Sequence, residues 1–497
     1  MLSALRKNTE RFLCSPSHPF LLGIYFIFRL YAHNIHGVPP EEFIRPLFLS
    51  LFSGAALQGL YVWRTHDRQK SAFLTSLTLT WFFLYGVARG GLASLKIVIP
   101  AFWFALIWLA LLLLLIWRIS SARRNSTQQD ITTSINLAAI ILLLFPAMQS
   151  IRYYSAKTIP FSTKIDHAVK LRSDQPLPDI YYIILDGYGR SDAVLPYGYD
   201  NSNFLASLEE MGFYVAECSQ SNYAGTGLSL SSSLNMDYVR NLSDAFPPGE
   251  TDLINLYKML ENNAVRRSLS DAGYKTVAFA SGFFWAEWRD ADLYVSPPPG
   301  PITEFEVVIL LSTFARVLDD LDIINLDDIH GDNFRRRTLL ALDELESIVK
   351  IQGPKFVFIH IIAPHEPSVF DGNGAPIPPD KVDSRSGYAN MAEFISTAIL
   401  PRLEMLIRES QTDPIIILQG DHGPSPRDPV DRMKILNAYY LPEGGDVLYP
   451  SISPVNSFRV VFNSIFDAGY PLLEDVSYFS NPPARYDFTI QPGTCPP

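Results

Sequence analysis

The stretch Pro414-Ile-Ile-Ile-Leu-Gln-Gly-Asp-His-Gly423 decides the fold class of this chain. Its first half is an apolar, β-branched run without polar alternation, so residues 414–419 are predicted to form a strand that is buried on both faces. Its second half ends this strand in an acid and an imidazole between two glycines. Such a strand belongs in a parallel sheet with helices on both sides.

Three more apolar runs fit the same description, at residues 180–185, 275–280 and 355–362. Helices are predicted around and between them at 204–211, 263–272, 334–350 and 388–409, and Pro401 is expected to kink or divide the last helix. This alternation predicts an α/β domain with a mostly parallel sheet between helices.

Polar side chains follow three of these strands directly. Asp186-Gly187 ends the first, Pro364-His365-Glu366-Pro367 follows the run at 355, and Asp421-His422 follows the run at 414. Ligands bind beyond the carboxyl ends of the strands in open parallel sheets, so these side chains are expected to meet at one edge. Carboxylates and imidazole suit a divalent cation such as Mn²⁺, Zn²⁺ or Mg²⁺.

A glycine-flanked hydroxyl is the candidate nucleophile. The segment Asn222-Tyr-Ala-Gly-Thr-Gly-Leu-Ser-Leu-Ser-Ser-Ser-Leu-Asn235 places Thr226 at the predicted start of a helix, with Ser229 behind it. Free N–H groups at a helix start bind phosphate, and a bound cation can lower the pKa of a hydroxyl enough for it to attack.

The order LDG, NYxxTxLSLxSS, APHEP and GDHG resembles the alkaline phosphatase and sulfatase superfamily. Over residues 178–445 the chain looks most like lipoteichoic acid synthases and lipid A phosphoethanolamine transferases, which also carry about five N-terminal spans. The resemblance implies one metal site, formed by Asp186 (usually Glu in those enzymes), Thr226, Asp421 and His422. It implies that His365 lies near the substrate phosphate.

The sequence lacks two features that some members of this superfamily have. No C/S-x-P-x-R segment, which sulfatases need, lies around Thr226, and no histidine follows His422, whereas two-metal members have a later one. A single divalent ion is therefore expected. Ser229, Trp285 and Arg289 are candidate substrate contacts, the last two by a loose match to the lipoteichoic acid synthases. His360 is interpreted as a core histidine, because it lies inside an apolar strand.

The N-terminal part is predicted to be a membrane domain, residues 1–151. Five apolar stretches lie at 19–32, 46–63, 72–88, 98–117 and 133–150, and a spanning helix needs about 20 apolar residues. Residues 152–176 are expected to be a polar linker and 177–497 the catalytic domain. Basic residues favour the cytoplasmic side, so an odd number of spans would place the catalytic domain outside the cytoplasm. The loops concerned contain Arg6, Lys7, Arg11, Arg64, Arg68, Lys70, Arg118, Arg123 and Arg124.

Charge and cysteines limit the partners further. The net charge of −11 argues against a nucleic-acid partner, because nucleic acid binds to basic surfaces. With no CxxC pair, a thiolate zinc site is unsupported. Cys218 and Cys495 are expected to be unpaired, although a disulfide is an open alternative if this part lies outside the cytoplasm.

Together these features predict a membrane-anchored enzyme that acts at the outer, extracytoplasmic face of the membrane. We expect it to transfer a phosphoryl-linked headgroup, of the phosphoglycerol or phosphoethanolamine type, from a phospholipid donor to a glycan or lipid acceptor. The alternative is a hydrolase of phosphodiesters, phosphomonoesters or sulfate esters, with water as the acceptor. The sequence does not separate the two.

Overall fold

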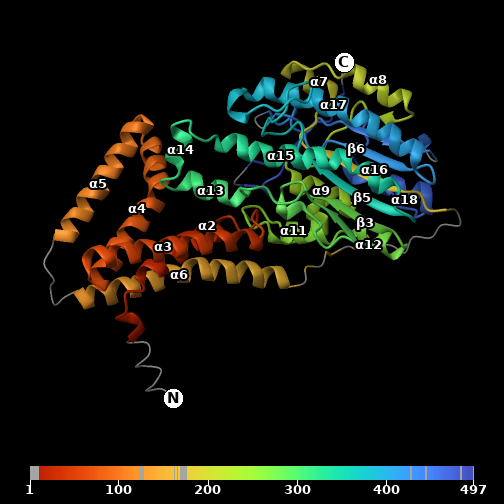
Figure 1. Cartoon of the computed structure of the whole chain (residues 1–497). Helices are drawn as coiled ribbons and strands as arrows, with labels where there is room; N and C mark the ends of the chain where they lie inside the picture. Colours follow the sequence, from red (N-terminus) through yellow and green to blue (C-terminus); the bar gives the residue numbers. More distant parts are fainter. Residues whose placement is uncertain are drawn as a thin grey trace. The chain divides into compact units, whose positions relative to one another are not determined.

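A computed structural model of the chain describes residues 11–121, 128–159, 161, 163–164, 166–167, 176–425, 428–442, 445–481 and 484–495 (Figure 1). The chain forms two compact units. A helical unit comprises Met1–Thr158 and Pro299–His330, and an α/β unit comprises Ile159–Pro298 and Gly331–Pro497.

The helical unit contains a helix at each of the five predicted apolar stretches. These are α2 (His18–His33), α3 (Ile44–Thr65), α4 (Arg68–Ser94), α5 (Ala101–Ser121) and α6 (Gln128–Thr158), with a short 3₁₀ turn at Pro40–Phe43. By length and composition, four segments of the described residues can cross a membrane: Pro40–Thr65, Arg68–Ser94, Ala101–Ser121 and Gln129–Thr158. The fifth helix, α2, is 16 residues long and packs against α6, α3 and α4.

The helical unit differs from the predicted domain boundaries in two places. Helix α6 continues to Thr158, past the predicted end of the membrane domain at 151. In addition, α13 (Glu304–Ser312), α14 (Arg316–Asp320) and the first turn of α15 (Leu326–Asp343) belong to this unit. Phe305 is buried beside Tyr31, and Phe314 packs edge-on against Tyr85, so apolar contacts hold the inserted segment to α2 and α4.

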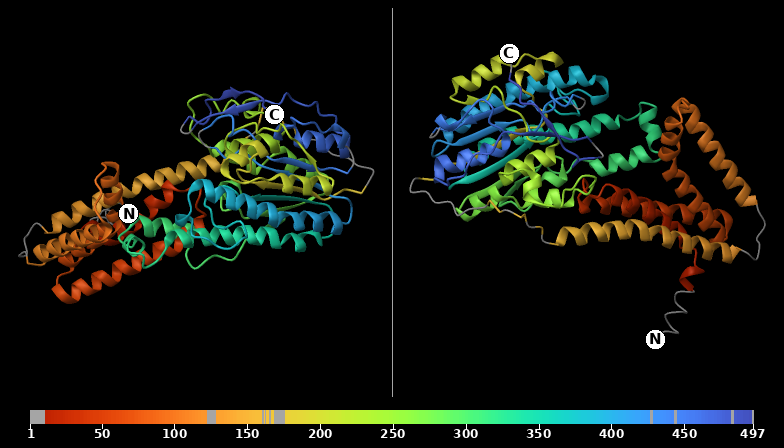
Figure 2. Two further views of the ribbon diagram at one scale, coloured as in Figure 1. Left: turned by 90° about the horizontal axis from the view of Figure 1, so that it is seen from above. Right: turned by 180° about the vertical axis from the view of Figure 1, so that it is seen from behind.

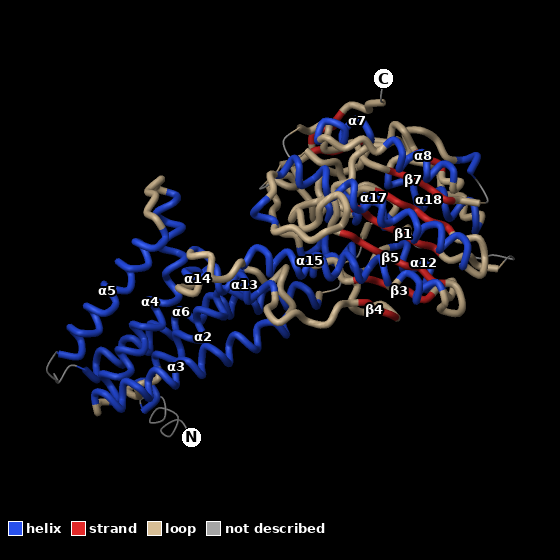
Figure 3. Tube along the Cα trace, turned by 45° about the horizontal axis from the view of Figure 1, so that its top comes forward, coloured by secondary structure: helices blue, strands red, loops and turns tan. Residues whose placement is uncertain are grey.

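The α/β unit is built on a seven-stranded sheet in the order β2-β7-β6-β1-β5-β3-β4 (Figure 3). Strands β1 (Ile180–Leu185), β3 (Lys275–Phe279), β5 (Lys355–Ile361) and β6 (Ile415–Gln419) confirm the four predicted strands. They run parallel together with β4 (Leu293–Val295), and β1 is central, with Ile183 opposite both Ile359 and Leu418. The antiparallel edge consists of β7 (Asn437–Tyr440) and β2 (Tyr214–Val215).

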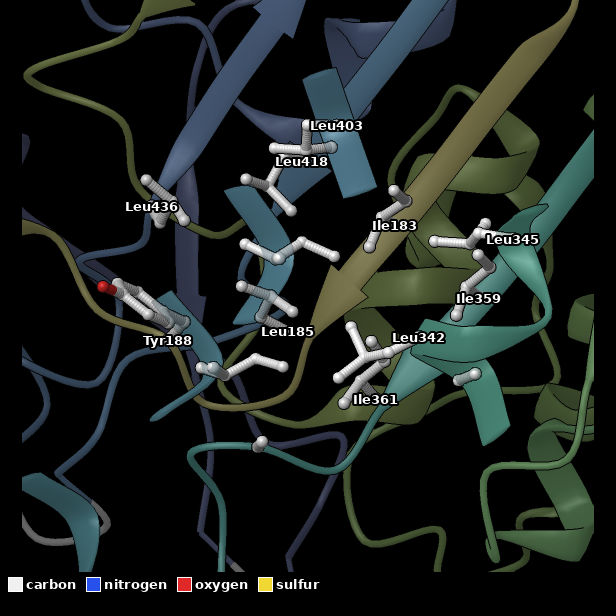
Figure 4. Close-up of a cluster of buried hydrophobic side chains, with 14 of the residues drawn as sticks. Ile183, Leu185, Tyr188, Leu342, Leu345, Ile359, Ile361, Leu403, Leu418 and Leu436 are labelled. Carbon is white, nitrogen blue, oxygen red and sulfur yellow. The ribbon is translucent and has the colours of Figure 1, made fainter. Parts of the chain in front are cut away.

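Alternate side chains of the apolar strands enter two separate cores. Ile183 and Leu185 of β1 pack under α8 (Ser202–Glu210), α15, α16 (Leu345–Val349) and α17 (Ser384–Glu409) (Figure 4). Tyr182 and Ile184 pack under α9 (Thr226–Asn235), α12 (Ala264–Asp271) and α18 (Pro454–Phe466) on the other face. Figure 2 shows these helices on the two faces of the sheet. Pro401 does not divide α17, which is one continuous helix.

The remaining α-helices and strands are short. They are α7 (Ser191–Val194), α10 (Val239–Leu242), α11 (Ile254–Glu261) and a hairpin of β8 (Ser477–Phe479) and β9 (Thr489–Gln491). Just beyond β9, Cys495 forms a disulfide with Cys218, so the expectation that these cysteines are unpaired was wrong. The two lie 277 positions apart in sequence, but the C-terminal strand returns beside the segment after β2. The separation of two cysteines in sequence does not show whether the fold brings them together.

Candidate metal centre and its cavity

Three adjacent strands bring the predicted ligands to one edge of the sheet. Because β1 lies between β5 and β6, Asp186, His365 and Asp421 follow neighbouring strands at their carboxyl ends. The backbone N–H of His365 donates to the carbonyl of Asp186 at 3.0 Å, and the N–H of Gly187 donates to Asp421 Oδ1 at 2.9 Å. Backbone hydrogen bonds therefore tie the three loops together.

His422 Nε2 lies at the centre of this group. It is 3.5 Å from Asp186 Oδ1, 3.4 Å from Asp421 Oδ2 and 3.4 Å from Thr226 Oγ1. The two aspartates and His422 are all buried, and neither of these carboxylate oxygens has a hydrogen-bond partner among the described residues. Two buried, unpartnered anionic oxygens are costly, so they indicate a cation site.

The separations between these atoms fit a bound divalent ion. Ligand atoms that bind a tetrahedral ion at about 2.0–2.1 Å lie roughly 3.4 Å from one another. Each of the three distances from His422 Nε2 matches this spacing. Among the described residues, Asp186 belongs to two groups whose ligand atoms lie within 4.8 Å of one another, one with His365 and His422 and one with His360 and Asp421. These residues fit a divalent ion, and the Thr226 hydroxyl lies beside them.

The environment of His422 leaves Nε2 free to act as a ligand. Its Nδ1 lies 3.1 Å from the carbonyl oxygen of Gly423, to which it donates, so Nε2 carries the lone pair. Burial and, after it, the positive charge of Arg432 lower the pKa of His422 to about 4. The imidazole is therefore neutral at physiological pH, which is the state that a metal ligand requires.

His360 is a core histidine, as predicted, and it also contacts one of the predicted metal ligands. Its Nε2 lies 3.0 Å from Asp186 Oδ2, and both side chains are buried. His360 thus occupies one oxygen of the carboxylate and leaves the other toward His422. Burial by itself would raise the pKa of Asp186, but His365 and, after it, His360 outweigh burial and lower that pKa. Asp186 is therefore an anion.

Thr226 is the first residue of α9, as predicted from its glycine flanks. Gly225 precedes it in an extended conformation and accepts hydrogen bonds from the N–H groups of Leu228 and Ser229. The N–H groups of the first helical turn that precede these have no partner within the helix and are available to an anion. The hydroxyl and the start of the helix therefore face the same place.

His365 stands beside the ligands and is partly exposed. Its Nδ1 lies 2.7 Å from the carbonyl oxygen of Glu366, and its ring centre lies 5.9 Å from that of His422. Burial alone would lower its pKa, but the charge of Asp186 and the hydrogen bond to Glu366 raise it. The raised pKa favours the protonated form of this imidazole relative to a free histidine.

Two glycines of the GDHG turn are needed for close approach. A Cβ at Gly420 would lie 2.2 Å from the carbonyl oxygen of Tyr188, and one at Gly423 would lie 2.1 Å from that of Asp431. Both contacts are with backbone atoms, which cannot move aside easily. The glycines thus let the turn fit between neighbouring backbone segments with both ligands in place.

A cavity of about 420 Å³ opens over Thr226, His365 and His422. One wall is an aromatic stack in which Trp285 lies between Tyr257 and Phe283, with ring centres 4.9 and 5.6 Å apart. The other lining residues include Gly227, Leu253, Leu256, Arg432, Phe479, Asn481 and Arg485. Sequence reasoning did not identify Arg432 or Arg485, which lie in loops without a recognisable motif.

The predicted substrate contacts differ in where they lie. Trp285 lines the cavity, whereas Arg289 does not and instead stacks over Phe284 and Tyr294. Ser229 is buried, and its hydroxyl lies 3.1 Å from that of Ser221 rather than in the cavity. Of the three predicted substrate contacts, only Trp285 lines the cavity.

Solved structures that align with this chain include phosphoethanolamine transferases and a sulfatase. The C-terminal periplasmic domain of EcEptC from Escherichia coli, in complex with zinc, is 13% identical over 67% of this chain and 96% of that one, with a TM-score of 0.43. The integral membrane protein lipooligosaccharide phosphoethanolamine transferase A from Neisseria meningitidis is 12% identical over 86% of this chain and 88% of that one, with a TM-score of 0.36.

A 2-O GAG sulfatase is 11% identical over 60% of this chain and 72% of that one, with a TM-score of 0.36. Neither the family models nor the curated proteins give a match to the sequence. The structural neighbours are of the classes that the sequence motifs resemble.

Proposed function

We propose that the chain is a membrane-anchored, metal-dependent transferase that moves a phosphoryl-linked headgroup through a covalent intermediate on Thr226. The observation that carries the proposal is the position of the Thr226 hydroxyl. It lies 3.4 Å from His422 Nε2, which lies at a similar distance from two unpartnered carboxylate oxygens. When bound there, a divalent cation lowers the pKa of a hydroxyl and offsets charge on phosphoryl oxygens.

The proposed reaction has two halves. The Thr226 hydroxyl loses its proton to solvent, and its oxygen then bonds to the donor phosphorus. The bond from phosphorus to the lipid oxygen breaks, and His365 gives that oxygen a proton. In the second half, an acceptor hydroxyl gives its proton to His365 as its oxygen bonds to phosphorus. The bond from phosphorus to Thr226 breaks, and the threonine oxygen takes a proton from solvent, which restores the enzyme.

The location that we propose is the outer surface of a membrane. Four segments of the described chain are long and apolar enough to span a bilayer, and basic residues gather in the loops expected to face the cytoplasm. The Cys218–Cys495 disulfide supports an extracytoplasmic α/β unit, because disulfides persist in oxidising compartments. Phospholipid donors would be available at this surface.

Replacement of the nucleophile tests the proposal directly. Membranes that contain the full chain are incubated with phosphatidylglycerol or phosphatidylethanolamine labelled in the headgroup, and the label is followed to an acceptor or to water. We expect Thr226→Ala to abolish headgroup release, and mass spectrometry of the unmodified chain to find the headgroup phosphate on Thr226. Full activity in Thr226→Ala would refute the assignment, whereas label in water would identify a hydrolase.

A further inference from the structure

Arg432 is a cation of the cavity that the proposed reaction has not yet used. Its Nε donates to the carbonyl of Ala224 at 2.8 Å, and its Nη1 donates to the carbonyl of Gly423 at 3.1 Å. Ala224 lies two positions before the nucleophile and Gly423 directly follows a predicted metal ligand. These two bonds fix the plane of the guanidinium between the nucleophile segment and the GDHG turn.

Arg432 forms no close ion pair with any residue that the structure describes. Among the described residues, no carboxylate lies within 4.0 Å of its guanidinium, and its Nη2 has no hydrogen-bond acceptor. Burial lowers the pKa of Arg432 more than the more distant carboxylates of Asp421 and Asp186 raise it. A half-buried cation held by carbonyls alone is costly unless an anion completes the site.

The charges of the site specify that anion. A divalent ion bound there would balance the two carboxylates of Asp186 and Asp421, and Arg432 would then supply positive charge for an anionic ligand. A phosphodiester carries one negative charge, and further negative charge gathers on its non-bridging oxygens during attack. A planar guanidinium matches phosphate oxygens better than an ammonium does, because its N–H groups form a rigid fork.

We infer that Arg432 binds a non-bridging oxygen of the donor phosphodiester and stabilises the charge that develops there when Thr226 attacks. This inference rests on the proposed function, since it assumes that the phosphorus lies between Thr226 and Arg432. It assigns Arg432 a role in substrate binding and in the transition state. The two backbone carbonyls orient the guanidinium, and the substrate occupies the side that has no acceptor.

The test compares Arg432 variants of the full chain in membranes, with the labelled donors described above. We expect Arg432→Ala to lower kcat/KM by about 10²–10³-fold, the usual effect of removing one such donor. Arg432→Lys, which keeps the charge but loses the fork, is expected to lie between Arg432→Ala and the unmodified chain. Added guanidinium ion is expected to restore part of the activity of Arg432→Ala, since it can occupy the space left by the side chain.

Arg459 provides a matched control for structural damage. Its Nε and Nη1 donate to the carbonyls of Met236 and Pro471, both at 2.7 Å, but it does not line the cavity. Arg459→Ala removes the same kind of double carbonyl contact, together with a guanidinium 4.0 Å from Asp237 Oδ2, and any activity that it loses should not return with guanidinium. Metal content and melting temperature are measured for every variant.

Phosphothreonine formation separates failure of this inference from failure of the proposed function. If the unmodified chain forms no covalent intermediate on Thr226, the proposed function fails. If it does, and Arg432→Ala forms the intermediate at a rate within about threefold, the role of Arg432 is overturned. The same holds if Arg432→Ala and Arg432→Lys lose activity only in proportion to lost metal or lost folded protein, without any response to guanidinium.

Discussion

His360 Nε2 lies 3.0 Å from Asp186 Oδ2 in the interior of the α/β unit, 174 positions away in sequence. The other oxygen of this carboxylate lies 3.5 Å from His422 Nε2. His360 therefore fixes which oxygen of Asp186 is left for a cation. Replacing a residue that orients a metal ligand in this way typically lowers metal affinity by about 10–100-fold.

Loss of His360 is therefore expected to weaken metal binding. We expect His360→Leu to lower the affinity for Zn²⁺ or Mn²⁺ by about 10–100-fold, measured by competition with a chelator. His360→Gln places an amide N–H where the imidazole was and should recover part of the affinity. Equal metal affinity in all three proteins would contradict the positioning role.

Trp285 is expected to bind the substrate through its ring. Trp285→Ala opens the wall of the cavity and breaks the stack with Tyr257 and Phe283, each of which is within 6 Å by ring centres. An aromatic contact contributes about 0.5–1.5 kcal/mol beyond burial, so KM should rise by roughly 2–12-fold. Trp285→Phe should keep KM within about threefold. Arg289→Ala tests the substrate contact that the sequence predicts. Because Arg289 does not line the cavity, KM should stay unchanged, and a rise in KM would indicate a direct contact.

The disulfide should stabilise the α/β unit. Replacing both Cys218 and Cys495 by serine is expected to lower the free energy of unfolding by about 2–5 kcal/mol, because the unfolded chain is no longer cross-linked. Denaturant unfolding of the purified full chain measures this change. Cys14→Ser is the control, since Cys14 is a free cysteine and its replacement should leave the unfolding midpoint unchanged.

Asp237 should make stability depend on pH in the acidic range. Burial raises its pKa, but hydrogen bonds, first from His167 at 2.7 Å, outweigh burial and lower it below the ordinary value. A pKa that is lower in the folded state stabilises the fold at pH values above the pKa of the unfolded state, which is about 3.9. This stabilisation is lost as the pH falls below that value toward the pKa of the folded state.

We therefore expect Asp237→Asn to lower the melting temperature at pH 6, and this difference to shrink as the pH falls from about 5 to about 3. Calorimetry at several pH values measures it. Asp244→Asn changes an exposed carboxylate and is the control. A difference that stays constant with pH would show that the carboxylate of Asp237 is not the source of the effect.

The sequence predicts the elements whose pattern is local. The runs that became β1, β5 and β6 are apolar throughout, because both of their faces are buried, and the polar residues that follow them meet for that reason. Short edge strands such as β2, with two residues, are too brief to show a pattern. Their strand character depends on a partner that lies far away in sequence.

Other features depend on packing that no local pattern records. Arg432 is one arginine in a polar loop, and only the fold shows that its guanidinium lines the cavity. The sequence places His360 in an apolar strand, but only the fold shows that its side chain contacts Asp186. The segment around α13 is apolar but only nine residues long, so its length gave no reason to separate it from the catalytic domain.

That segment has a practical consequence for handling the protein. The backbone leaves the α/β unit after Pro298, contributes α13 and α14 to the helical unit, and returns at Gly331. A protease that cuts only between α6 and β1 would therefore leave residues 299–330 attached to the α/β unit at both ends, and these residues would still hold it to the other helices by non-covalent contacts. Shedding of a free catalytic fragment from cells would need cleavage on both sides of residues 299–330 as well.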